Sequence, residues 1–179
     1  MLSPSFNASQ DHYLGDEQAR VELIQYGDYQ CRHCGDTVPV IRQLREAMAG
    51  DLKFVFRHFP LPNLHHLSLD AAVAAEAAGM QGKFWQMHFK ILENQFYLNR
   101  ASFDVLAEEL RLDMSLFGLH RRNRHLFRKI TSDFESGIHS GVNGTPTFFI
   151  NSQRYNGFDD FEGLYKVCRF AAGYYKMVI

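Results

Sequence analysis

The stretch VELIQYGDYQCRHC, residues 21–34, joins an apolar run to two cysteines that stand three positions apart. Residues 21–26 have the length and composition of a buried strand, and the segment after Cys34 has the apolar spacing of a helix. At a helix start this spacing lets the two sulfurs meet, and the helix N-terminus favours the thiolate of the first one. The stretch therefore indicates redox chemistry, with Cys31 as the attacking thiol and Cys34 as the thiol that closes a short disulfide.

The same cysteine spacing also supplies half of many zinc sites. The only other cysteine is Cys168, and His65 and His66 are adjacent, so on a regular element they point in different directions. We therefore expect no bound metal and no other cofactor. A non-catalytic zinc or partner-binding module that uses the CxxC stays open as the alternative from another class.

Composition and charge limit the class of protein. The 179 residues are 46% hydrophobic, which is enough for a full core in one domain with an insertion. The formal net charge of -1 argues against a dedicated nucleic-acid binder. One basic cluster is interpreted as the solvated face of an amphipathic helix, because Leu119, Leu126 and Ile130 recur around it at near-helical spacing. Its members are Arg121, Arg122, Arg124, His125, Arg128 and Lys129.

The sequence shows neither a secretory signal nor a membrane span. Residues 1–8 lack a basic region and a continuous apolar region, and the alanine-rich stretch 71–80 is short and interrupted by Glu76. At face value the chain is cytoplasmic. A mature or truncated chain from the periplasm, or from another extracytoplasmic compartment, would look the same.

The pattern of the first third predicts a parallel pair of strands. A second strand is expected at residues 53–59, stopped by Pro60, and the strand-helix-strand order implies a right-handed crossover. Pro39 predicts a kink in the intervening helix. Before the first strand, Asp11-His12 is expected to mark a turn.

From residue 68 to about residue 141 the apolar pattern is helical. One helix is expected over the alanine-rich segment, another over residues 83–93, and two more after it. The expected N-caps are Ser68, Ser102 and Asp113, and the expected helix ends are Gly79 and either Gly137 or Gly141. The aromatic residues Phe84, Trp85 and Phe89 are more typical of a core than of a peptide-binding surface.

Strand character returns at residues 147–151, and residues 154–157 are expected to pair back as an antiparallel edge strand. A final helix is expected over roughly residues 158–174. Cys168 shares a face of that helix with apolar side chains, so we interpret it as a buried, inert thiol.

The stretch GVNGTPTFFI, residues 141–150, places a proline at the threshold of a strand. A cis bond between Thr145 and Pro146 would turn the chain sharply and leave the backbone groups of Thr145 exposed for a partner. Taken alone, Gly-Thr-Pro is equally well explained as an ordinary turn.

Together the two motifs resemble the DsbA-like branch of the thioredoxin superfamily. The matching segments are residues 26–34, 77–79, 83–85 and 141–151, which follow one another in the family's order. The resemblance implies an α/β thioredoxin fold, a central mixed sheet flanked by helices, with an all-helical domain inserted between its halves. We expect residues 1–62 to form the half with the CxxC, residues 63–140 the insertion, and residues 141–179 the half with the cis-proline loop.

The resemblance also implies thiol-disulfide exchange with protein or peptide substrates, and a redox recycling partner whose identity the sequence does not give. Cys31 would attack, Cys34 would resolve, and Thr145 and Pro146 would lie against the disulfide and dock extended substrate. A cytoplasmic reductase or isomerase, or a glutathione-linked relative of the same fold, stays open as the alternative within this class.

One departure from the family lies between the cysteines. Members commonly carry proline directly after the first cysteine, and here that position is Arg32. The Arg32 guanidinium, with His33 beside it, is expected to stabilise the Cys31 thiolate and lower its pKa. Stabilising the reduced form favours an oxidising couple.

A second departure lies six residues before Cys31, where relatives often bury an acid that assists proton transfer. Here that residue is Gln25, which cannot titrate. Either another group, such as Asp28 or a water molecule, moves the proton of Cys34, or resolution is slower.

Overall fold

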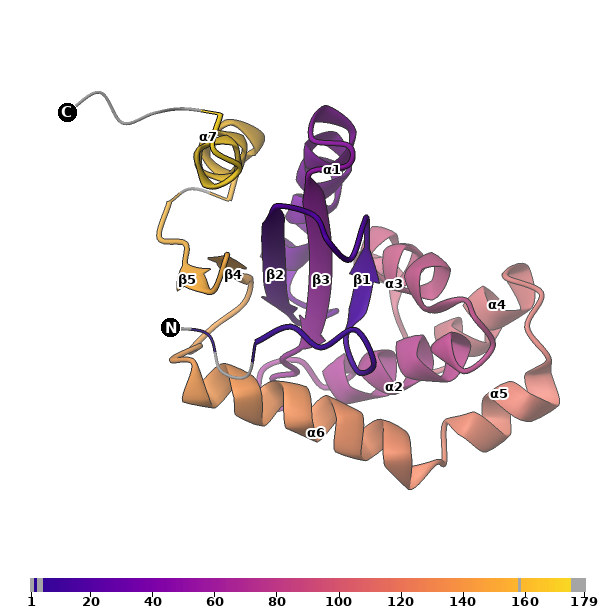
Figure 1. Ribbon diagram of the computed structural model, residues 1–179. Helices are drawn as coiled ribbons and strands as arrows, with labels where there is room; N and C mark the ends of the chain where they lie inside the picture. The colour runs from indigo at the N-terminus through magenta and orange to yellow at the C-terminus, as the bar shows by residue number, and fades with distance from the viewer. Residues whose placement is uncertain (1, 3–4, 158, 175–179) are drawn as a thin grey trace.

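The computed structural model describes residues 2, 5–157 and 159–174. Its strands are β1 (His12–Leu14), β2 (Val21–Gly27), β3 (Leu52–His58), β4 (Thr147–Ile150) and β5 (Gln153–Arg154). Its helices are α1 (Arg32–Ala47), α2 (Ser68–Gly79), α3 (Phe84–Glu93), α4 (Ser102–Glu109), α5 (Met114–His120), α6 (Arg124–His139) and α7 (Phe161–Ala171), with a 3-10 turn, η1 (Gln95–Tyr97), after α3. Figure 1 shows α2 to α5 gathered beyond the β1 edge of the sheet.

The sheet has the strand order β1-β3-β2-β4-β5, with β2 at its centre. Strand β2 is parallel to β3 and antiparallel to β4, so Leu23 pairs with Phe54 on one side and with Ile150 on the other. Helix α1 connects the two parallel strands, as the strand-helix-strand pattern predicts. The α/β class and the central mixed sheet flanked by helices are confirmed.

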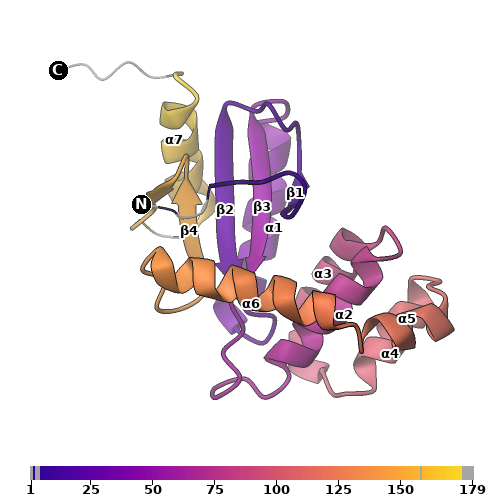
Figure 2. The same cartoon turned by 60° about the horizontal axis from the view of Figure 1, so that its bottom comes forward.

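Each face of the sheet has its own apolar core, because successive side chains of a strand point to opposite faces. Leu23 and Phe54 belong to the larger core, which α1, α7 and the helices after β3 complete. Ile24 and Val55 belong to the smaller core on the other face, against which Phe134 of α6 packs. Figure 2 shows α6 crossing the lower part of the sheet. The two faces are therefore covered by different parts of the chain.

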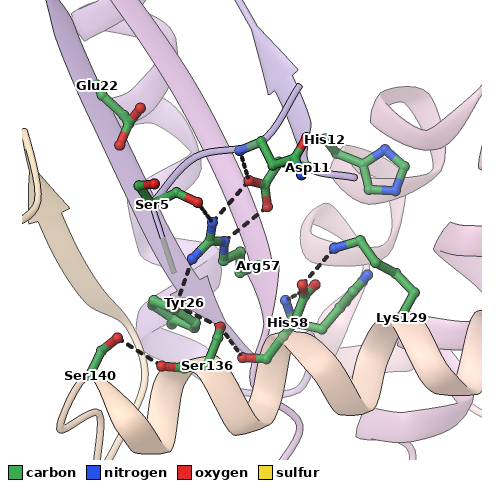
Figure 3. A network of polar contacts seen from close by, with 12 residues as sticks. Ser5, Asp11, His12, Glu22, Tyr26, Arg57, His58, Lys129, Ser136 and Ser140 are labelled. Carbon is green, nitrogen blue, oxygen red and sulfur yellow. Dashed lines mark hydrogen bonds and ion pairs between the residues drawn. The ribbon is translucent and has the colours of Figure 1, made fainter. Parts of the chain in front are cut away.

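A buried polar network links the sheet to α6 (Figure 3). The Arg57 guanidinium on β3 donates from Nε and Nη2 to the two carboxylate oxygens of Asp11, both at 2.9 Å, and from Nη1 to the Tyr26 hydroxyl at 3.0 Å. The Tyr26 hydroxyl is also 2.8 Å from Oγ of Ser136 on α6. A buried charge of this kind is tolerated because its donors are met by a carboxylate and a hydroxyl.

The turn expected at Asp11-His12 is wrong, because His12 begins strand β1 and pairs with Phe56 of β3 in antiparallel register. Three residues are too few to show a strand period, and this strand is held by contacts from distant segments. The His12 ring stacks on Phe84 with ring centroids 3.4 Å apart, and its Nε2 lies 2.9 Å from a carboxylate oxygen of Glu76.

The helical segment differs from the expectation in number and in capping. Three helices, α4 to α6, follow η1 in the described chain, where two were expected, since the chain breaks between α5 and α6 and Asn123 caps α6 by accepting from the backbone N–H of His125 at 2.9 Å. Leu119 therefore belongs to α5, where it is 65% exposed, and not to the apolar face of α6. Of the expected N-caps only Asp113 is confirmed, because Ser68 and Ser102 are already the first residues of their helices.

The C-terminal end of α6 and the start of α7 can be compared with the expected positions. Gly141, with φ +80°, comes directly after the C-cap of α6, whereas Gly137 lies inside that helix, where a Cβ would be 2.7 Å from the Phe59 ring. At the other end of the chain, α7 begins after Asp160, which accepts from the backbone N–H of Gly163 at 2.7 Å. The earlier start expected at Phe158 lies outside the described residues.

Strand β5 is shorter than the expected residues 154–157 and comprises Gln153 and Arg154, while its antiparallel pairing with β4 is confirmed. Phe84 is buried, and Trp85 and Phe89 pack against the larger core, as expected for core aromatics. Within the described ranges, no helix combines the length and the apolar character needed to cross a membrane.

Candidate active site

The two cysteines of the CxxC stand at the N-terminus of α1. Cys31 is the N-cap, and its carbonyl accepts from the backbone N–H groups of Cys34 at 3.0 Å and of Gly35 at 3.3 Å. Cys31 is 8% exposed, while Cys34, within the first turn, is fully buried. The less buried sulfur is therefore also the one at the helix start, near the backbone N–H groups of His33 and Cys34.

The surroundings separate the acidities of the two thiols. A hydrogen bond from the Cys34 side chain, followed by the Thr145 side chain and the backbone N–H groups of Cys34 and His33, outweighs burial and lowers the pKa of Cys31 to about 5. Burial raises the pKa of Cys34 well above its usual value, and the neighbouring Cys31 raises it further. At neutral pH the reduced pair is thus one thiolate and one thiol.

The loop that carries Thr145 and Pro146 meets the first cysteine through the Thr145 carbonyl. The peptide bond between them is cis, as the resemblance implies. In the thiol form, Sγ of Cys31 donates to the carbonyl oxygen of Thr145 at 3.1 Å. The Thr145 hydroxyl is buried and has no hydrogen-bond partner among the described residues. It is the group that can donate to Sγ once Cys31 is a thiolate.

Arg32 and His33 lie between the two cysteines in the sequence, and both side chains are exposed. The His33 side chain is 80% exposed, and its Nδ1 lies 3.8 Å from a carboxylate oxygen of Asp36. His33 contributes to the low pKa of Cys31 through its backbone N–H. An electrostatic role for the guanidinium and the imidazole stays a prediction.

Gln25 is buried behind the cysteines in a short chain of hydrogen bonds. Its Nε2 donates to the Thr37 hydroxyl at 3.1 Å, and that hydroxyl donates to the carbonyl oxygen of Cys34 at 2.8 Å. The position that an acid often occupies in relatives is therefore filled by a neutral amide with a structural contact to the α1 backbone.

Asp28 contacts the buried thiol through its backbone. Its N–H donates to Sγ of Cys34 at 3.5 Å, and its buried carboxylate accepts from the backbone N–H of Gln30 at 2.8 Å. The second carboxylate oxygen accepts from the backbone N–H of Leu61 at 2.8 Å and lies 3.0 Å from Nδ1 of His65. The His65 side chain is 27% exposed, so it connects this carboxylate to solvent.

Sequence reasoning missed two residues at this site, His65 and Gln95. His65 was considered only as a metal ligand, and Gln95, in η1, was not considered at all. Its Nε2 donates to the carbonyl oxygens of Tyr29 at 2.7 Å and of Cys31 at 2.9 Å. No local pattern marks a glutamine between two helices, because only the fold brings η1 to the start of α1.

No group of three or more histidine, cysteine, aspartate or glutamate side chains in the described part of the chain is arranged to hold a metal ion. The zinc alternative therefore gains no support from the structure. Cys31, Cys34 and Cys168 are all free thiols.

The chain matches a known protein family in sequence. A family profile described as Thioredoxin matches residues 7–168. Among curated proteins, the Na(+)/H(+) antiporter NhaA 1 of Salinispora arenicola is 40% identical over 154 residues, which cover 86% of this chain and 24% of the antiporter. NhaA 1 of Mycobacterium sp. (strain KMS) is 36% identical over 149 residues, covering 82% of this chain and 24% of that protein. The chain thus spans about a quarter of the length of these relatives.

Several solved structures have the same architecture. The thiol-disulfide exchange protein α-DsbA2 of Wolbachia pipientis has a TM-score of 0.80 at 25% identity, covering 89% of this chain and 86% of that one. A thioredoxin-like oxidoreductase of Silicibacter pomeroyi has a TM-score of 0.80 at 23% identity, over 93% and 94% of the two chains. Oxidised BdbD of Bacillus subtilis has a TM-score of 0.82 at 19% identity, over 93% and 95%. The likeness shows a shared fold along nearly the whole chain.

Proposed function

Because the chain belongs to the thioredoxin family and shares its fold with α-DsbA2, we propose that it is a DsbA-like enzyme, which exchanges a Cys31–Cys34 disulfide with protein thiols through a mixed disulfide at Cys31. The observation that carries the proposal is the difference in acidity between the two thiols. The pKa of Cys31 is lowered to about 5, whereas Cys34 is fully buried and its pKa is raised. One sulfur is built to be attacked and to leave, and the other to be hidden.

This difference in acidity suits both steps by which the disulfide would oxidise a substrate. A substrate thiolate attacks Sγ of Cys31, forming a substrate–Cys31 disulfide and breaking the Cys31–Cys34 bond, whose electron pair stays on the Cys34 sulfur. That sulfur takes up a proton, because burial disfavours its thiolate. A second substrate thiolate then attacks the substrate sulfur of the mixed disulfide, and Cys31 leaves as a thiolate. Two substrate thiols have become a disulfide, and the enzyme holds the two electrons.

The Thr145 hydroxyl supports the leaving step. It is buried without a partner in the described structure, and the thiolate that forms at Cys31 offers it one. A charge-assisted hydrogen bond of this kind is stronger than the neutral contact that Sγ makes with the Thr145 carbonyl. Extended substrate would dock beside it, along the loop with Pro146, and the charges of Arg32 and His33 would add to the field at Cys31.

Proton transfer at Cys34 is assigned to Asp28 in place of Gln25. The Asp28 backbone N–H already contacts Sγ of Cys34, and its carboxylate reaches the partly exposed His65. The Asp28 carboxylate does not contact the sulfur among the described contacts, so a water molecule would bridge the two, and His65 would lead from the carboxylate to solvent.

The low pKa of Cys31 also bears on the direction of exchange. Since the environment stabilises the reduced, thiolate form, the couple is expected to act as an oxidant. The compartment stays a prediction: an oxidant of protein thiols suits an extracytoplasmic compartment. A recycling partner must remove the two electrons in either case.

Reduction or oxidation of insulin-type disulfides tests the proposal. Cys31→Ser should abolish exchange, because the attacked sulfur is gone. Cys34→Ser should instead accumulate mixed disulfides with substrate, which mass spectrometry detects as an adduct at Cys31. Full exchange activity in Cys31→Ser would overturn the assignment.

A further inference from the structure

Gln95 reaches the start of α1 from the far part of the sequence. It lies in η1, and the single Nε2 atom donates to two carbonyl oxygens that are two residues apart, those of Tyr29 and Cys31, at 2.7 and 2.9 Å. These carbonyls flank Gln30, the last residue before the CxxC. A bond to both fixes the orientation of the peptide groups that lead into Cys31.

The Cys31 carbonyl is a sensitive place for such a contact. It is the first acceptor of α1, since it receives the backbone N–H groups of Cys34 and Gly35. The partial negative charge of this carbonyl oxygen belongs to the same residue as the sulfur that becomes a thiolate. A third donor, from Gln95, offsets part of that negative charge and holds the carbonyl in line with the helix.

Gly35 makes room for the glutamine. A Cβ at Gly35 would lie 2.3 Å from Oε1 of Gln95, so any larger residue would push the amide away. The glutamine side chain therefore packs directly over the first turn of α1. Oε1 is the end of a flexible side chain, so a methyl group at this position would move the amide without disturbing the backbone.

We propose that Gln95 is a positioning residue for thiol-disulfide exchange, which holds the Tyr29–Cys31 backbone in the orientation that stabilises the Cys31 thiolate. The inference rests on the proposed function and adds to it a contribution from the helices between β3 and β4. Through Gln95, the placement of η1 sets the reactivity of a thiol on another element.

Other charged and titratable groups lie at the start of α1 and on the segments near it. Those on α1 are Arg32, His33, Cys34 and Asp36, those on neighbouring loops are Asp28 and His65, and Asp159, which lies before α7, has a pKa raised by burial and opposed by His33. Variants of Gln95 leave all of these in place. A changed titration of Cys31 in such variants therefore reports the two lost hydrogen bonds.

The experiment measures the pH dependence of Cys31 alkylation in the reduced protein and its equilibrium with glutathione. Gln95→Met keeps the volume of the side chain and removes both donors. It should lower the ratio of thiolate to thiol at Cys31 near pH 5, and shift the glutathione equilibrium towards a weaker oxidant, each by about fivefold, the typical effect of one net hydrogen bond. Gln86→Met, on an exposed position of α3, is the matched control and should change neither quantity.

Gly35→Ala provides an independent route to the same contact, and alanine favours the helix. It should reproduce the shift of Gln95→Met, and the double variant should be no worse than either single variant, because both remove one interaction. If folded Gln95→Met and Gly35→Ala titrate like the parent protein, the positioning role is wrong even though the parent exchanges disulfides. If the parent itself lacks exchange activity, it is the proposed function that fails.

Discussion

The N-terminus of α1 and the middle of α7 both bury a cysteine, with opposite chemical results. Cys31 is 8% exposed and Cys168 fully buried, so neither is a surface thiol. Hydrogen bonds led by the one from Cys34 lower the pKa of Cys31 to about 5, whereas burial without a compensating donor raises the pKa of Cys168 to about 12. Position on the helix and the donors around the sulfur, and not burial, decide which thiol reacts.

The largest expected difference is in alkylation. At pH 7 the reduced native protein should be labelled by iodoacetamide at Cys31 more than about 10³-fold faster than at Cys168, since only the former is a thiolate. Mass spectrometry of the labelled peptides measures both rates in one sample. Comparable rates at the two sites would erase the distinction between the two regions, while labelling of Cys168 after unfolding serves as the control.

A second difference should appear in the stability of the reduced protein. The folded pKa of Cys31 is depressed from 9.0 to about 5. Its contribution to stability is therefore fully present above pH 9 and is lost as the pH falls through 5, with a total of up to about 5 kcal/mol. Urea unfolding of the reduced protein between pH 5 and 8 should show this rise in unfolding free energy, and Cys31→Ser should remove it. A slope unchanged in Cys31→Ser would assign the pH dependence to other groups.

A smaller effect is expected at Thr145. Thr145→Val keeps the shape of the side chain and removes the hydroxyl that can donate to the Cys31 thiolate. The apparent pKa of Cys31 should rise, with roughly a fivefold weaker oxidant in the glutathione equilibrium. Thr147→Val is a useful control, because the Thr147 hydroxyl donates to the Gly144 carbonyl at 2.8 Å and not to a cysteine. Equal shifts in both variants would mean that the loop, and not the hydroxyl, tunes the thiol.

The sequence was most informative where the chain is locally consistent. Strands β2, β3 and β4 are short segments rich in apolar and aromatic residues, and α1 keeps its apolar spacing through Pro39, so their positions could be predicted. Strand β1 could not, because its three residues are held by Glu76 and Phe84 from distant helices. The break at Asn123 was also missed, since the apolar spacing on either side of it resembles one helix.

The residues of the candidate active site also divide into those that local sequence identifies and those that only the fold brings into place. The two cysteines and the Thr145–Pro146 pair were identified from motifs that stand in the sequence. Gln95 and His65 were not, since neither belongs to a motif and each acquires its contact only when β3 and the following helices fold over α1. Residues that a motif contains can be predicted, whereas those that support it from other elements need the structure.

The central claim is that the start of α1 stabilises a thiolate and so makes this couple an oxidant. The most direct test is the equilibrium reduction potential of the Cys31–Cys34 pair against glutathione, measured together with the pH dependence of Cys31 alkylation. The account predicts an alkylation pKa near 5, and a potential closer to that of DsbA, about −120 mV, than to that of thioredoxin, about −270 mV. A near-normal thiol pKa with a thioredoxin-like potential would contradict it.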